Sequence, residues 1–152
     1  MFSNNELKMK NIIFSIGFCI ISITSFSQSK DFINNMTPTY PDCGNKDDRS
    51  KCYIVGFSDL IISDLNKSNF SGLDRIQIKL LIRTETDGKS TILRLKSDNS
   101  EVERIAHSAL TKAPLVEPIK SQNGKNEISS KDFTVVAIWN KKSNKYEMFY
   151  KY

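Results

Sequence analysis

The sequence predicts an α+β domain in which a small antiparallel sheet packs against two helices. Three observations predict it: two segments with apolar residues at helical spacing, two alternating segments on either side of an Asp-Gly pair, and a β-branched, aromatic segment near the C-terminal end. With 152 residues and no internal repeat, the chain has the size of one such domain. Hydrophobic residues at 39% and charged residues at 26% are typical of a folded protein, and the net charge of +5 arises from interleaved signs.

Residues 1–27 have the order of a secretory signal peptide. Two lysines precede an apolar stretch over 11–21, and small residues follow up to Ser27. We therefore expect export to the periplasm with cleavage near Ser27, and translation that starts at Met1 or Met9. An uncleaved inner-membrane anchor is the alternative, because the same stretch and its flanks carry enough uncharged residues to cross a bilayer.

The next segment, 28–42, contains two prolines among polar residues and reads as an irregular lead-in to a domain over 43–152. Cleavage removes Cys19 and leaves an even pair, Cys43 and Cys52, in a compartment where disulfides persist. We expect these two to be bridged. Two buried free thiols are the alternative.

The domain begins with a predicted helix over Lys51–Asn66, where apolar residues recur at spacings of three and four behind two aspartates suited to a helix start. Arg75–Arg83 alternates between apolar and polar residues, which is the period of a half-buried strand. Asp87-Gly88 follows and predicts a hairpin, because both central positions of a two-residue turn can take positive φ. Thr91–Lys96 is then the returning strand.

A second helix begins at Ser100, where the Ser-x-x-Glu spacing to Glu103 predicts a capping box, and it ends before Pro114. One stripe of this helix is apolar: Val102, Ile105, Ala106, Ala109 and Leu110. A polar loop that contains Asn123-Gly124 leads to the closing strand. The amphipathic stripe predicts that this helix packs on the sheet.

The closing strand is rich in β-branched and aromatic residues: Phe133, Thr134, Val135, Val136, Ala137, Ile138 and Trp139. Lys141–Asn144 then predicts a turn, and Tyr146–Tyr150 predicts a terminal strand that returns along the closing strand. A frayed terminus is the alternative for this tail.

Residues with catalytic or metal-binding chemistry are scarce in the sequence. His107 is the single histidine and lies off the apolar stripe of its helix, so we expect neither zinc nor a nucleophilic triad. No glycine cluster suited to a nucleotide phosphate is present. The paired carboxylates stand at helix starts, where they complement the dipole. We therefore expect no enzyme activity, no cofactor, no small-molecule substrate and no nucleic-acid partner.

Several short motifs occur in a definite order: Tyr40-Pro41-x-Cys43, Lys51-Cys52, the strand from Arg75, Asp87-Gly88, Ala113-Pro114, Glu117-Pro118 and Asn123-Gly124-Lys125. In this order they resemble the C-terminal domain of TonB energy transducers, in the variant with two cysteines upstream. The resemblance implies a periplasmic binding module without catalysis. Its family grips the extended N-terminal segment of outer-membrane receptors by adding it as a strand to a sheet edge.

The strand edge that the resemblance assigns to the partner is Phe133–Trp139. A short lead-in with two prolines replaces the long proline-rich spacer of a transducer, so we expect a stand-alone exported module that binds a receptor or another envelope protein. A membrane-anchored transducer for outer-membrane transport is one alternative. The other is an envelope structural protein that binds no receptor.

Overall fold

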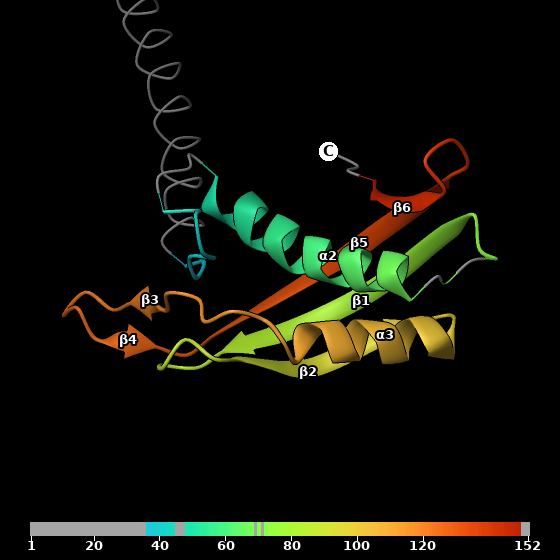
Figure 1. The fold of residues 1–152 in the computed structure, drawn as a ribbon. Helices are drawn as coiled ribbons and strands as arrows, with labels where there is room; N and C mark the ends of the chain where they lie inside the picture. The colour runs from blue at the N-terminus through green and yellow to red at the C-terminus, as the bar shows by residue number, and fades with distance from the viewer. Residues whose placement is uncertain (1–35, 45–47, 69, 71, 150–152) are drawn as a thin grey trace, which may run out of the picture. The chain divides into compact units, whose positions relative to one another are not determined.

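The computed structural model of the protein describes residues 36–44, 48–68, 70 and 72–149, which belong to one compact unit. The predicted signal peptide and most of the predicted lead-in lie outside the described residues. Two helices and a small antiparallel sheet form an α+β fold, as predicted (Figure 1). Helices α2 (Arg49–Lys67) and α3 (Ser100–Leu110) both cover one face of the sheet.

The main sheet has four antiparallel strands in the order β2-β1-β5-β6. Their bounds are β1 (Arg75–Thr84), β2 (Ser90–Ser97), β5 (Ser129–Asn140) and β6 (Lys145–Met148). A second, two-stranded sheet pairs β3 (Ile119–Lys120) with β4 (Asn126–Glu127). The strand β5 therefore begins four residues before the predicted closing strand, because its polar start pairs with the end of β1, Ser129 opposite Thr84.

The helix α2 packs the aromatic side of the core. Its Tyr53 and Phe57 are fully buried, with ring centroids 4.8 Å apart, and Phe57 also approaches Phe133 of β5 at 6.5 Å. The Asp48 carboxylate caps the helix by accepting the Lys51 N–H at 2.8 Å, which agrees with the acidic helix start in the sequence. The helix thus fixes its first turns above β5.

The helix α3 buries the five apolar residues of the predicted stripe. Its cap differs from the prediction, since the helix cap is Asn99 rather than Ser100. The Asn99 side chain accepts the N–H groups of Glu101 and Val102 at 3.0 and 3.1 Å. Glu103 Oε1 instead accepts the Ser97 N–H at 2.7 Å, so it ties the helix to the end of β2. The cap therefore lies one residue before the predicted position, and Glu103 bonds the end of β2 instead of the capping residue, so the predicted capping box does not form.

Two hairpin loops have the same construction. In the first, Glu85 N–H donates to Lys89 O and Gly88 N–H donates to Glu85 O, and only Gly88 of the Asp-Gly pair has positive φ, at 85°. The predicted two-residue turn is therefore wrong, and a three-residue loop takes its place. Ser121, Gly124 and Lys125 repeat the pattern between β3 and β4, where the sequence predicts only a loop.

The segment that leads into α2, residues 36–44, is held against the domain by backbone hydrogen bonds, an aromatic contact and a disulfide. Thr39 and Glu117 exchange two backbone hydrogen bonds of 2.8 Å. The Tyr40 ring lies on Gly56, where an added Cβ would come within 2.5 Å of the ring. Cys43 and Cys52 form the predicted disulfide, with Cα atoms 5.9 Å apart.

Candidate functional site

The strand β5 has a fully paired inner side and a half-paired outer side. On the inner side it pairs with β1 from Ser129 to Ile138. On the outer side β6 pairs only with Ala137–Asn140, and the last hydrogen bond of this ladder runs from Phe149 N–H to Val136 O at 2.8 Å. Within the described part of the chain, no strand covers the outer side of β5 between Ser129 and Val135.

The backbone groups along this open half point outward at every second residue. In an extended strand, the N–H and C=O of one residue point to the same side and those of the next residue to the other side. Because Val136 O faces β6 and Trp139 N–H donates to Asp74 O on the β1 side, the alternation assigns the outer direction to Thr134, Asp132 and Ser130. These residues offer three N–H groups and three C=O groups to an added strand.

A groove of about 400 Å³ runs between this edge and the first turns of α2. Its walls are Ser50, Lys51, Ile54, Val55 and Ser58 of α2, with Asp48 at the cap, and Phe133, Thr134, Val135 and Val136 of β5. The Ser58 hydroxyl donates to Ile54 O at 2.7 Å within the helix, so the middle of the groove offers mainly apolar surface. Met148 and Phe149 line its end.

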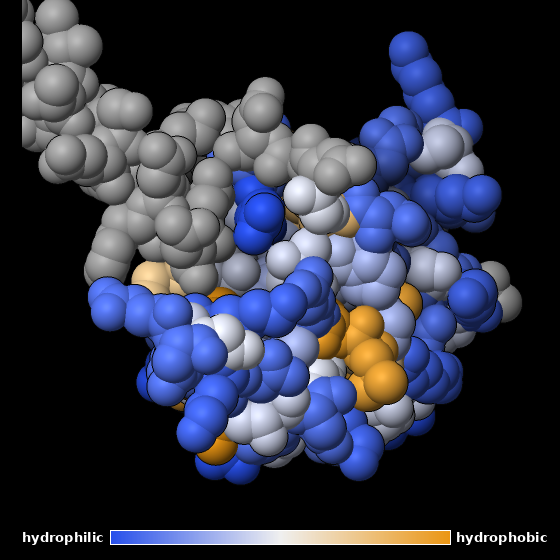
Figure 2. Space-filling model, turned by 90° about the vertical axis from the view of Figure 1, so that its left-hand side faces the viewer, coloured by the Kyte–Doolittle hydropathy of each residue, from blue (hydrophilic) through white to orange (hydrophobic). Residues whose placement is uncertain are grey.

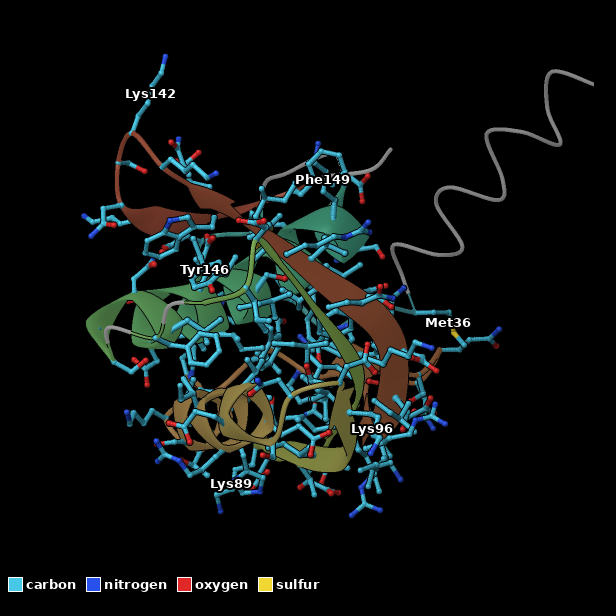
Figure 3. The ribbon with its side chains drawn as sticks, turned by 90° about the vertical axis from the view of Figure 1, so that its right-hand side faces the viewer. Met36, Lys89, Lys96, Lys142, Tyr146 and Phe149 are labelled. Carbon is cyan, nitrogen blue, oxygen red and sulfur yellow. A yellow bond between two sulfur atoms is a disulfide. The ribbon has the colours of Figure 1, made fainter. Side chains whose placement is uncertain are left out.

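The end of the groove is held in place by Tyr146, the buried anchor of β6. Its hydroxyl donates to Leu73 O at 2.9 Å, and its ring meets the Trp139 ring at 4.9 Å between centroids. Asn66 of α2 bonds both backbone groups of Tyr146, at 2.7 and 3.0 Å. Figure 3 shows Tyr146 on the side of the sheet that faces α2, with Phe149 farther along the chain near the helix. The covered half of β5 is therefore a packed hairpin.

The structure divides the predicted partner edge, Phe133–Trp139, into two parts. Phe133 and Val135 are buried under α2, Thr134 is exposed on the open face, and all of these lie along the groove. Val136 also lines the groove, and its C=O accepts the Phe149 N–H, whereas the remainder of the edge, Ala137–Trp139, is paired with β6. The α2 wall of the groove was not predicted as part of a site, and Ile54 and Val55 appeared in the sequence only as helix residues.

The described residues contain no cluster of three or more histidine, cysteine, aspartate or glutamate side chains able to hold a metal ion. His107 lies on the exposed side of α3. Burial raises the pKa of Tyr53, whose hydroxyl lies 3.3 Å from Thr84 Oγ1 in the core. Its phenol therefore remains protonated at neutral pH and serves packing.

No helix in the described ranges is both long and apolar enough to cross a membrane. The apolar stretch over 11–21, on which the predicted signal peptide and its alternative as an anchor depend, lies outside those ranges.

Figure 2 shows that the end of the molecule with β3 and β4 is mostly hydrophilic, with a small hydrophobic patch.

Comparison of the chain with protein-family models, with curated proteins and with solved structures finds no match.

Proposed function

We propose that the protein is an exported, non-catalytic binding module that takes up an extended segment of another protein as a new strand on the open half of β5. The observation that carries the proposal is the juxtaposition of an unpaired strand edge and an apolar groove. The edge supplies main-chain hydrogen bonds, and the groove accepts every second side chain of the added strand. Such binding requires no catalytic group.

The dimensions of the site fit a short segment. A strand laid from Val135 to Ser130 would span six residues, or about 20 Å at the usual rise per residue. The walls of the groove hold such a strand from both sides, since Ile54 and Val55 lie on α2 and Phe133 and Val135 lie on β5. The sequence motifs that resemble TonB support a periplasmic partner, namely the N-terminal segment of an outer-membrane receptor or another envelope protein.

A proline at Thr134 tests this proposal directly. Thr134→Pro removes one N–H that faces the open edge and leaves the hydrogen bonds between β5 and β1 unchanged, because those come from the neighbouring residues. The probe is a set of capped heptapeptides with valine or isoleucine at alternate positions. Binding is followed by the amide NMR shifts of Ser130, Asp132 and Thr134 in the parent domain.

We expect the peptides to shift these edge amides in the parent domain and in the matched control, Thr134→Ala. Binding to Thr134→Pro is expected to be at least tenfold weaker, because one hydrogen bond between uncharged groups is lost and the ring blocks the edge. The free energy of unfolding should fall by less than about 1 kcal/mol, so that the domain stays folded. Equal binding to the proline variant, or no shift in the parent domain at millimolar peptide, overturns the proposal.

A further inference from the structure

The open half of β5 lies beside a row of two lysines on the face of the sheet that the helices leave open. Lys79 of β1 stands opposite Thr134 on one side and opposite Lys96 of β2 on the other. The row therefore reads Lys96, Lys79, Thr134 and then the position of an added strand. Figure 3 shows Lys96 low on the sheet, on β2. Like charges directly opposite each other in a sheet repel.

Of these two lysines, Lys79 has no ion pair within the described residues. The Lys96 ammonium group lies 3.8 Å from the Glu103 carboxylate of α3. Between Lys79 and the outer edge of β5 stands Thr134, whose short side chain leaves room for the lysine to extend toward that edge. Two other cations of this face have partners: Arg83 bonds Glu85 at 2.6 Å, and Arg94 bonds Asp132 at 2.8 Å. Lys79 thus lies beside Thr134 on the open face of the sheet, and within the described residues it has no ion pair.

The pair of Arg94 and Asp132 shows that such a reach across a strand occurs in this fold. Arg94 of β2 and Asp132 of β5 flank Leu81 of β1, and their side chains meet at 2.8 Å across that middle strand. A strand added to β5 would be separated from β1 by β5, just as β5 is separated from β2 by β1. Thr134 would then stand between the two charged residues, as Leu81 stands between Arg94 and Asp132. A carboxylate opposite Thr134 would lie two strand spacings from Lys79, about 10 Å between backbones, which two extended side chains can bridge.

On the basis of the proposed function, we infer that the partner segment carries an acidic residue between two apolar residues. The apolar residues stand opposite Val135 and Phe133, so that their side chains share the inward face and enter the groove beside Ile54 and Val55. The acidic residue stands opposite Thr134 and pairs with Lys79. Because the pattern is symmetric, it holds for either direction of the added strand.

The test compares three capped heptapeptides that differ only at the central position, Val-Asp-Val, Val-Thr-Val and Val-Lys-Val. Binding to the full domain is measured by calorimetry and by edge-amide shifts at low salt. We expect the aspartate peptide to bind about two- to fivefold more tightly than the threonine peptide, and the lysine peptide to bind more weakly, as for exposed cross-strand charges. The preference should shrink at 0.5 M salt, which screens such pairs.

Charge reversal at Lys79 supplies the decisive variant. Lys79→Glu should invert the order, so that the lysine peptide binds best. The matched control is Arg75→Glu, which makes the same charge change on the same strand and face, but opposite Ile138 in the half of β5 that β6 covers. It should leave the preference for aspartate unchanged.

The outcomes separate the two ideas. If all three peptides bind equally well, or if Arg75→Glu inverts the order as Lys79→Glu does, the acidic residue and its pairing are wrong, and strand addition stands. If no peptide binds to the edge, both the inference and the proposed function fall.

Discussion

The two halves of β5 differ in what lies along their outer side, although both pair with β1 in one continuous register. The covered half, Ala137–Asn140, is closed by β6 and packed through Tyr146. The open half, Ser129–Val135, carries polar residues at the positions that point their backbone outward, Ser130, Asp132 and Thr134. Polar and charged residues on an exposed edge discourage uncontrolled pairing with other chains. The difference teaches that the length of β6, and not the strand β5 itself, determines which part of β5 keeps an unpaired outer side.

The largest loss of stability is expected from a variant that removes the packing of β6 on the covered half of β5. Tyr146→Ala removes a fully buried ring that contacts Trp139 and Phe70, so we expect the free energy of unfolding to fall by about 3 to 5 kcal/mol. Tyr146→Phe keeps the ring and loses only the hydrogen bond to Leu73, at a cost of about 1 kcal/mol. Urea denaturation measures both. A loss below 1 kcal/mol for the alanine variant would mean that β6 is not packed on the domain.

A pair of proline variants sharpens the comparison directly. Ile138 stands opposite Glu147 of β6, so Ile138→Pro removes a ladder hydrogen bond and should lower the free energy of unfolding by about 1 to 3 kcal/mol. Thr134→Pro changes the same kind of position in the open half, and there we expect a loss of less than about 1 kcal/mol. Thermal and urea unfolding of the two variants give the contrast. Equal losses would contradict an open edge.

The smallest effect is a control far from β5. Asn99→Ala removes the cap of α3 and should cost about 1 kcal/mol, whereas Ser100→Ala should stay within about 0.5 kcal/mol. Neither change should alter peptide binding, because α3 does not line the groove. If Asn99→Ala weakened peptide binding as strongly as Thr134→Pro, the effect of the proline could be ascribed to lost stability.

The helices and the hairpin of β1 and β2 were predictable because their signals are local. Periodic apolar residues mark α2 and α3, and alternation marks β1. The cap of α3 was placed one residue late, since Asn99 and Ser100 are both good capping residues and the spacing to Glu103 favoured the second. The choice between adjacent caps depends on how the chain leaves β2, which tertiary structure determines.

The loop between β3 and β4 shows how context limits such a prediction. Asp87-Gly88-Lys89 and Asn123-Gly124-Lys125 form the same turn, with the first side chain accepting the N–H of the lysine at 3.0 and 3.3 Å. Long alternating segments flank the first triplet, and two-residue strands flank the second. Only the first was therefore predicted as a hairpin.

The candidate site was predictable only on its strand side. Phe133–Trp139 has strong strand propensity, and a tail after a turn predicts a further strand. The point where β6 stops covering β5 follows from the register of the hairpin and from the anchor at Tyr146. The second wall of the groove forms because α2 crosses over β5, and no local sequence pattern encodes how two such distant elements pack. The hydrogen bonds from Asn66 of α2 to Tyr146 of β6 likewise join residues that are 80 positions apart.

The fastened lead-in determines how the domain would carry tension. A pull at Met36 first meets the two hydrogen bonds between Thr39 and Glu117, and then the covalent bridge from Cys43 to Cys52. Because the disulfide connects Cys43 directly to Cys52, the force reaches α2 at Cys52, beside the groove. The first residues of the helix, which precede Cys52, are then not under load. A strand held on the open half of β5 and pulled along its axis would be loaded in shear, with all of its hydrogen bonds resisting together. In the proposed complex, a pull between the entry segment and a bound strand would therefore pass through the disulfide and the backbone hydrogen bonds of β5, and not through the end of α2.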